Sequence, residues 1–314
     1  MTLGCNHTIH KSQSHFGWDN SITPRLMVAS GDTVEFKTVD SSGGQLTLSS
    51  TIADIAKLDF AKVNPVSGPI YLHDAEPGDA VKVTILGYTP SGWGWTANIP
   101  GFGLLADQFK EPALHLWRYE KSLGEPAAFG AGGRVPLRPF CGTIGLAPAE
   151  PGHHSVVPPR RVGGNMDIRD MAEGTELWLP VEVAGGLFSV GDTHAAQGDG
   201  EICGTAIESQ MDIAVRFDLV KQAGLAFPRF FVPSRGPDPR GRAGWDATTG
   251  IGPDLMAGTR DAVKSMIDLL CRRHNLSAVE AYMLCSVAGD LKISEVVDQP
   301  NWVVSFYFPR AVFE

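Results

Sequence analysis

The chain has 314 residues, which is long enough to bury a sizeable core in one large domain or in two intimate smaller ones. Hydrophobic residues make up 43% of it and charged residues 19%, as in globular proteins. The net charge of −9, with no basic stripe, argues against a nucleic-acid partner. The 36 glycines and 22 prolines exceed what a helical protein would tolerate, so turns must be frequent.

Nothing in the sequence indicates export or membrane insertion. Residues 1–15 are polar and lack an apolar signal core, and nowhere do about 18 apolar residues run together. The five cysteines are odd in number and widely separated, with no C-x-x-C pair, which argues against a disulfide framework and a thiolate zinc knuckle. We therefore expect a cytoplasmic protein with reduced thiols and no membrane partner.

Strands are predicted over most of the first two-thirds of the chain. Residues 25–36, RLMVASGDTVEF, read as two strands or as a strand and its hairpin partner around a Ser-Gly-Asp turn. An E-P-G-D turn then separates the strands GPIYLHDA and AVKVTILGY, and an Ala-Gly-Gly turn joins TELWLPVEV to GGLFSVGDTH. The segment IESQMDIAVRFDLV predicts one more strand.

The run SGWGWTANIPGFGLLADQF, residues 91–109, has too many glycines and prolines for regular structure. Its aromatic residues suggest a loop folded over a pocket, in which Trp93, Trp95 and Phe102 could wall a small substrate site. Packing of these rings against the core is the alternative.

Helices are predicted only late in the chain. Apolar residues fall at helical spacing over residues 258–273, and Ser277 with Glu280 has the spacing of a capping box for a second helix that ends at Gly289. VVSFYF reads as a closing strand. The order predicts an α+β, mainly β fold: a sheet-on-sheet sandwich or barrel-like core with a few peripheral helices. We expect one domain over residues 1–314, which could comprise two intimate β-rich subdomains.

The densest polar cluster, GDTHAAQGDGE at residues 191–201, follows the apolar strand GLFSV. If the strand runs on through His194, Asp192 and His194 project from one face, as a carboxylate and an imidazole that share a zinc ion would need. The glycines that follow would let the backbone bring Asp199 or Glu201 back toward the ion. The alternative is a polar strand end and turn, with Asp192 as a cap and His194 satisfied in the core.

The run GDTHAAQGDGEICGTAIE, preceded by NMDIRDMAEGTELWLPVEVAGGLFSV, resembles the signature of the acetamidase/formamidase family. Five further stretches agree in the same order, so the resemblance covers nearly the whole chain. They are HFGWDNSITPRLMVASGDTVEF, NPVSGPIYLHDAEPGDAVKV, GWGWTANIPGFGLLADQF, PLRPFCGTIGLAPAEPG and VVDQPNWVVSFYFP. Cys141 in PFCGTIG and the His73-Asp74 pair sit where we expect variation, which bears on substrate preference more than on fold.

The resemblance implies hydrolysis of short amides such as formamide or acetamide to ammonia and a carboxylate, a homo-oligomeric assembly, and dependence on a divalent metal, expected to be zinc. Asp192 and His194 match the family's G-D-x-H positions, Glu201 its G-D-G-E position, and His15 and Asp19 its N-terminal H-x-x-W-D segment.

An amide is a poor electrophile with a poor leaving group, so a catalyst must supply a nucleophile, stabilise the oxyanion and protonate the departing nitrogen. A zinc ion lowers the pKa of bound water to about 7 and polarises the carbonyl, while a nearby carboxylate ferries the proton. We predict that Glu201 is this carboxylate, with Asp199 or Glu208 as alternatives. Asn165 and Asp167 could orient the substrate or support the ligands, or could form an ordinary polar turn. The predicted metal ligands are Asp192, His194, Glu208 and His15; the predicted substrate contacts are Asn165, Asp167, Gln197 and Trp95.

Two other classes of function remain open at this point. A cysteine nucleophile, Cys141 or Cys203, could act with a spatially close histidine and carboxylate, although an inert buried thiol is the more frequent fate of such residues. A non-catalytic β-domain that binds a metal or a small ligand could also retain these polar residues.

Overall fold

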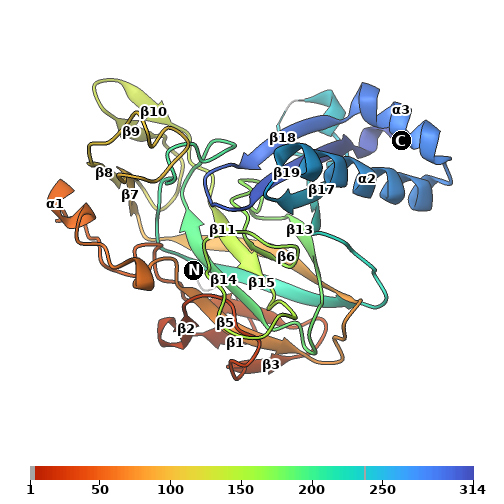
Figure 1. Cartoon of the computed structure of the whole chain (residues 1–314), viewed down its shortest axis with the longest axis horizontal. Helices are drawn as coiled ribbons and strands as arrows, with labels where there is room; N and C mark the ends of the chain where they lie inside the picture. The colour runs from red at the N-terminus through yellow and green to blue at the C-terminus, as the bar shows by residue number, and fades with distance from the viewer. Residues whose placement is uncertain (1–3, 237) are drawn as a thin grey trace.

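The computed structural model describes residues 4–236 and 238–314 and shows two β-sheets packed face to face (Figure 1). The larger sheet has nine strands, antiparallel except for the β1–β4 pair. In spatial order they are β1 (His7–Ile9), β4 (Thr33–Phe36), β15 (Met211–Val220), β6 (Ala80–Pro90), β13 (Glu176–Pro180), β16 (Arg229–Val232), β17 (Trp245–Gly252), β19 (Trp302–Pro309) and β18 (Asp290–Glu295).

The second sheet has six strands and carries the signature segment. Its order is β12 (Gly163–Asn165), β11 (Phe140–Gly145), β14 (Phe188–His194), β5 (Val66–Leu72) and β2 (Ser14–His15), with β3 (Leu26–Val28) also paired to β5. Two hairpins stand apart from both sheets: β7 (Trp93–Asn98) with β8 (Ala113–Arg118), and β9 (Ala127–Phe129) with β10 (Gly133–Val135). The remaining short elements are α1 (Ile52–Ile55) and 3-10 turns over Lys11–Gln13, Phe60–Lys62, Pro239–Gly241 and Arg310–Phe313.

The main core lies between the two sheets. Phe188 of β14 meets Phe36 of β4 and Phe217 of β15 edge to face, with ring centroids 5.6 and 4.9 Å apart. All three rings are buried, because alternating strand positions present one apolar face to the opposite sheet. The predicted α+β, mainly β class is confirmed, and of the two architectures considered the chain adopts the sandwich.

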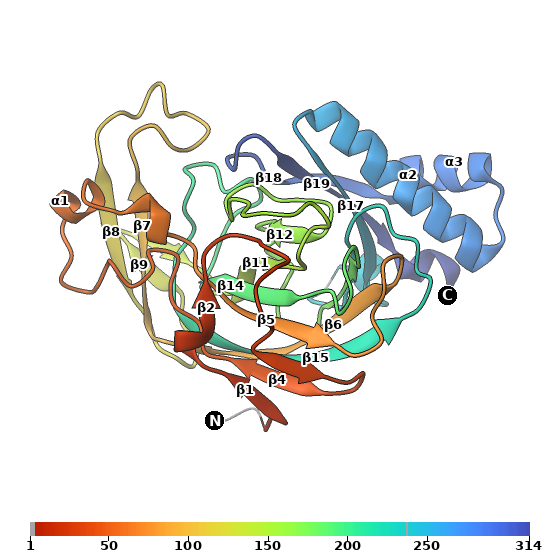
Figure 2. The same ribbon diagram turned by 60° about the horizontal axis from the view of Figure 1, so that its bottom comes forward.

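The predicted turns join strands of different sheets. The strands on either side of residues 30–32 are β3, which pairs with β5 in the smaller sheet, and β4, which pairs with β15 in the larger one. The hairpin interpretation of residues 25–36 is therefore wrong. The turns at residues 76–79 and 184–186 likewise connect β5 to β6 and β13 to β14 across the sandwich (Figure 2).

The expectation of an irregular loop over residues 91–109 is wrong for its first part, which forms β7. Trp95 pairs with Leu116 of β8, and aromatic residues favour such cross-strand pairs. Gly94 suits the strand because a Cβ there would lie 2.6 Å from the backbone oxygen of Glu208. The glycine thus permits a close approach of the Glu208 main chain.

The late helices are confirmed. α2 (Leu255–His274) and α3 (Ala278–Ala288) pack beside the β17 and β19 end of the larger sheet (Figure 2). The capping box is present, since the Ser277 hydroxyl accepts from the Glu280 N–H and the Glu280 carboxylate accepts from the Ser277 N–H. Within residues 4–236 and 238–314, no helix is long and apolar enough to cross a membrane.

Candidate active site

His194 ends β14, between β11 and β5 in the smaller sheet, and its side chain is buried. Its Nε2 lies 3.0 Å from Asp192 Oδ1 and 3.1 Å from Glu208 Oε2. The single Nε2–H can form a full hydrogen bond to only one of these two carboxylate oxygens. The other oxygen then has no donor on this side unless a cation or a shared proton lies between the two carboxylates. An imidazole nitrogen and two carboxylate oxygens are also a donor set that suits zinc.

Asp192 reaches the imidazole through an unusual backbone conformation. Its φ of 50° lies in the left-handed region, which costs free energy for a non-glycine residue and tends to occur at functional sites. The carboxylate also accepts a hydrogen bond from Asn64 Nδ2 at 3.3 Å, and Thr143 Oγ1 lies at the same distance. The predicted proximity of Asp192 and His194 is thus observed.

After β14 the chain turns back and runs alongside that strand, and Glu208 lies on this returning segment. The segment is held to β14 by a hydrogen bond that Ser209 N donates to Thr193 O at 2.9 Å. Its carboxylate accepts from Ser41 Oγ at 2.6 Å and from Ala206 N at 2.7 Å. Because a hydroxyl and a main-chain amide fix both oxygens, the second carboxylate beside His194 is held rigidly.

The other ring nitrogen faces a second group of carboxylates. His194 Nδ1 lies 3.7 Å from Asp167 Oδ1, and among the described residues neither this nitrogen nor either Asp167 oxygen has a hydrogen-bond partner. Glu201 completes a group in which one ligand atom from each of the three residues lies within 4.8 Å of the others. Buried groups without partners are rare and point to a missing ligand or water.

The site contains far more buried acid than base. Burial and the Asp167 carboxylate raise the pKa of Glu201 well above its usual range, and burial together with Asp192 does the same for Asp167. Burial alone would lower the pKa of His194, but Glu208 and Asp192 outweigh it and raise that pKa. A divalent cation would offset this excess of negative charge, so the residues present fit one.

Sequence reasoning missed two further acids beside this group, Asp298 and Glu295, and Asp298 lines the same cavity as Glu201. Burial and Asp167 raise the pKa of Asp298, and burial raises the pKa of Glu295 to about 7. Asp298 Oδ2 accepts a 2.6 Å hydrogen bond from Asn165 Nδ2. The one available signal was the VVDQP stretch near the C-terminus, which is distant from the cluster in sequence.

Gly142 of β11 forms the floor of the cluster. A Cβ at this position would lie 2.8 Å from both Asp192 Oδ2 and His194 Cε1, and closer still to Asp167 Oδ1. Real Cβ atoms essentially never approach other heavy atoms within 3.0 Å, so the side chains occupy space that any larger residue would need. This glycine was also missed from the sequence.

A cavity of about 210 Å³ opens onto the cluster, and Asp192, Glu201 and Glu208 line it. Asn165 and Trp95 line it as well, and the Trp95 indole is oriented by a 3.0 Å hydrogen bond to Asp40. The rest of the wall is largely apolar: Leu58, Phe60, Val63, Ile99, Phe102 and Val157. Such a cavity suits a small, uncharged molecule with one polar group.

The remaining predicted residues lie outside this cavity. His15 hydrogen-bonds Ser189 Oγ and Gly17 O, both at 2.9 Å, and belongs to neither group of ligand atoms; burial lowers its pKa to about 4. Asp199 pairs with Arg169 at 2.9 Å, and Gln197 donates to the backbone oxygen of Asp167. The structure therefore does not bring His15 to the imidazole–carboxylate cluster, because both of its ring nitrogens are engaged elsewhere.

Asp199 and Gln197 line a larger neighbouring cavity of about 570 Å³, whose wall also includes Glu201 and Cys203. Asp167 lines neither cavity and supports His194 from behind. Cys141 is buried, and burial raises the pKa of its thiol to about 12.

The fold and site together define a β-sandwich enzyme with a buried imidazole–carboxylate centre that serves a small substrate. The family model described as "Acetamidase/Formamidase family" matches residues 5–154 and 149–314. The chain belongs to the acetamidase/formamidase family, which confirms the resemblance.

Individual relatives agree. The chain is 29% identical to a formamidase from Methylophilus methylotrophus over 96% of its own length and 90% of that protein. It is 29% identical to an acetamidase from Mycolicibacterium smegmatis over 70% of each. Its structure is similar to that of an acetamidase from Bacillus halodurans, with a TM-score of 0.86, 31% identity and 98% of each chain covered.

Proposed function

We propose that the protein hydrolyses the C–N bond of short aliphatic amides, such as formamide and acetamide, to ammonia and a carboxylate, with a divalent metal ion, expected to be zinc, held by Asp192, His194 and Glu208. The observation that carries the proposal is the convergence of two carboxylate oxygens on His194 Nε2, since both of these carboxylates line the small cavity. When bound, such an ion polarises an amide carbonyl and lowers the pKa of water.

Glu201 is the proposed proton carrier. Its carboxyl group lines the cavity, and the upward shift of its pKa allows it to hold a proton nearer to neutral pH than an exposed glutamate would. It can therefore take a proton from the attacking water and pass it to the departing amide nitrogen. Asp199 was the alternative, but its ion pair with Arg169 in the larger cavity argues against that role.

The residues behind and above the imidazole have supporting roles. Asp167 faces His194 Nδ1, so its carboxylate can orient the ring and stabilise the tautomer whose Nε2 faces Asp192 and Glu208 without a proton. Gln197 fixes the main chain of Asp167 from the larger cavity. Asn165 is the proposed amide contact, and its own orientation is set by Asp298 and Thr143.

The wall of the cavity favours short chains. Trp95 and Phe102 face the space above the carboxylates, and they would exclude bulk water and leave room for one or two carbons beside the amide. We expect formamide, acetamide and propionamide to be cleaved much faster than a bulky anilide.

The test combines turnover with metal analysis. Purified protein should release ammonia from formamide or acetamide, should contain a stoichiometric divalent ion, and should lose activity on chelation and recover it when the metal is restored. His194→Ala should lose metal and activity together. Glu201→Gln is nearly isosteric and should retain metal while turnover falls by about 10²-fold or more.

Two results would contradict the proposal. Active protein without a stoichiometric ion, or a fully active His194→Ala variant, would rule out the metal mechanism while leaving the amidase assignment in place. Absence of ammonia release from all three short amides would favour the alternative of a non-catalytic binding domain.

A cysteine nucleophile is less consistent with the site. The thiol of Cys141 points into the core, hydrogen-bonds the Tyr88 hydroxyl at 3.4 Å, and has a pKa raised to about 12, which disfavours the reactive thiolate. Cys203 lines the larger cavity, where its Sγ donates to Thr205 O at 3.3 Å.

We further propose that the protein works in the cytoplasm as a homo-oligomer. Support for assembly comes from α3, where four exposed apolar side chains share spacing suited to one helix face: Val279, Tyr282, Met283 and Val287. Light scattering of the purified protein tests this, and a monomer at micromolar concentration would refute it.

A further inference from the structure

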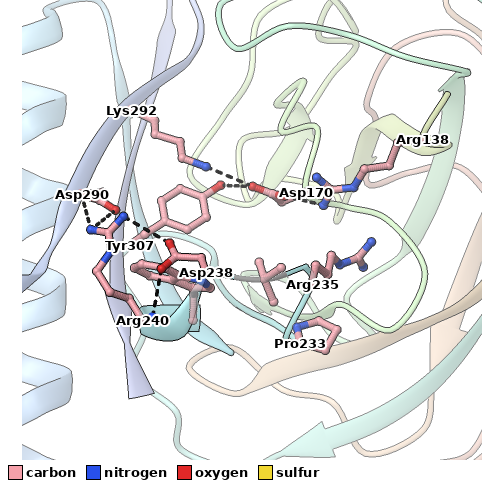
Figure 3. A pocket seen from close by; sticks show the side chains of 11 residues that line it. Arg138, Asp170, Pro233, Arg235, Asp238, Arg240, Asp290, Lys292 and Tyr307 are labelled. Carbon is pink, nitrogen blue, oxygen red and sulfur yellow. Dashed lines mark hydrogen bonds and ion pairs between the residues drawn. The ribbon is translucent and has the colours of Figure 1, made fainter. Parts of the chain in front are cut away.

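A third cavity, of about 250 Å³, is lined by side chains of β18, of β19 and of the segment that follows β16, together with Arg138 and Asp170 (Figure 3). Four cationic side chains line it, against three carboxylates, so it differs in character from the apolar cavity above the cluster. The cations are Arg138, Arg235, Arg240 and Lys292; the acids are Asp170, Asp238 and Asp290.

One half of this cavity is organised around Asp170. Arg138 Nη2 forms an ion pair with Asp170 Oδ1, the Tyr307 hydroxyl donates to Oδ2 at 2.8 Å, and Lys292 Nζ lies 3.4 Å from Oδ2 (Figure 3). Lys292 also sits over the Tyr307 ring, 3.8 Å from its centroid. The single carboxylate of Asp170 thus pairs with two cations, Arg138 and Lys292, and these three side chains together keep a net positive charge.

Arg235 adds a third cation, on which Asp170 and Glu173 act electrostatically without forming an ion pair among the described residues. Among the described residues no carboxylate oxygen lies within 4.0 Å of its guanidinium, which donates through Nη2 to the backbone oxygen of Glu173. Burial and the like charge of Arg138 lower the pKa of Arg235. Arg138 Nε is itself buried without a hydrogen-bond partner. That buried nitrogen is not open to the cavity, but the side chains of both arginines line it.

The other half of the cavity carries a net negative charge, because its one cation faces two carboxylates. Arg240 pairs with Asp238 at 3.3 Å and with Asp290 at 3.2 Å, so its charge is matched by two acids of the same surface. The unmatched positive charge is confined to the half formed by Arg138, Arg235 and Lys292.

We propose that Arg138 and Arg235 bind a small, doubly charged oxyanion in this half of the cavity, and inorganic phosphate is the simplest such ligand. Three cations against one carboxylate leave an excess of two positive charges, which such an anion would balance. The planar fork of arginine donors matches the oxygens of phosphate, and hydrogen bonds between two ions are about twice as strong as neutral ones. The volume is sufficient for one such ion.

The proposed anion site is distinct from the imidazole–carboxylate cluster but is built on adjoining segments. The Arg138 amide donates to Ala195 O at 2.8 Å, directly after His194. Asp170 lies three residues after Asp167. None of the residues that line the third cavity lines the small cavity above the cluster, so anion binding does not depend on the proposed amidase activity.

Isothermal titration calorimetry of the full-length protein with potassium phosphate, at constant ionic strength and neutral pH, tests the proposal. Wild type should bind about one phosphate per chain, and Arg235→Gln should weaken binding by about tenfold or more while its melting temperature in the absence of phosphate stays near that of wild type. Arg240→Gln is the matched control, because it removes a cation from the same cavity that is already neutralised, and its affinity should change little.

Three results of the phosphate titrations would overturn the proposal. They are no binding by wild type at millimolar phosphate, unchanged affinity in Arg235→Gln, and equal weakening in the Arg240→Gln control, which would indicate unspecific attraction. Acetate forms the second arm of the titration and should bind more weakly because it carries a single charge. Affinity for acetate equal to that for phosphate would exclude a site for a doubly charged ion.

Discussion

Gly142→Ala is the most direct test of how the cluster is packed. The added methyl would lie 2.8 Å from both Asp192 Oδ2 and His194 Cε1 and nearer still to Asp167 Oδ1, so all three side chains must retreat to reach 3.0 Å or more. The φ of Gly142 is outside the left-handed region, so alanine meets no backbone penalty and the effect is purely steric.

The expected loss follows from these distances. Asp192 and His194 would have to move by a few tenths of an ångström, and Asp167 would have to move further. We expect kcat/KM to fall by about 10- to 100-fold, because a misplacement of about 1 Å lowers the rate by about 10²-fold. Overpacking should also lower the free energy of unfolding by about 1–3 kcal/mol.

The assay measures ammonia release and urea unfolding for Gly142→Ala and for Gly252→Ala. Gly252 ends β17, and a Cβ there meets no atom within 4 Å, so this control should retain wild-type activity. A Gly142→Ala enzyme with wild-type kcat/KM would refute the tight packing of the three groups against β11.

The buried thiol, the cap of α3 and the Asp170 carboxyl each provide a further test. Cys141→Ala should retain most of the ammonia release, and a loss as deep as that of His194→Ala would revive the thiol mechanism. Ser277→Ala should cost about 1 kcal/mol in urea unfolding and leave kcat unchanged, whereas unaltered stability would contradict the role of the cap. Burial would raise the pKa of Asp170, but Lys292 and Arg138 outweigh it and lower the pKa to about 2 from 3.8. The contribution of the ionised Asp170 carboxylate to the free energy of unfolding should therefore be complete above about pH 4 and should disappear as the pH falls through about 2. The difference in unfolding free energy between wild type and Asp170→Asn should narrow by about 2 kcal/mol over that range, and a constant difference would count against the ion pairs.

Features that depend on neighbouring residues could be predicted well. The capping box between Ser277 and Glu280 spans one helical turn, and Asp192 and His194 are two residues apart, so their contacts depend mainly on local backbone geometry. The return of the chain that brings Glu208 to His194 follows β14 closely in sequence. These short separations explain why three of the four predicted ligands meet.

Features that depend on distant segments could not be predicted. Asp298 and Glu295 reach the cluster from the C-terminal edge of the larger sheet, and Gly142 reaches it from β11. His15 matched the family segment in sequence, yet a strand pairing with β5 turns its ring to Ser189 instead. No local periodicity encodes such contacts, because they depend on which strands become neighbours.

The sequence by itself determined the β-rich class, the late helices, the family and the central imidazole–carboxylate pair, because hydrophobic periodicity, capping residues and a contiguous motif are local properties of the chain. Only the tertiary structure decided that each predicted turn crosses from one sheet to the other, that Asp167 and Asp192 face opposite nitrogens of one imidazole, and that Arg138 and Arg235 share a cavity. The physical reason is that burial between two sheets selects strand partners by the fit of whole apolar faces, and polar groups far apart in sequence are brought together as a consequence of that selection.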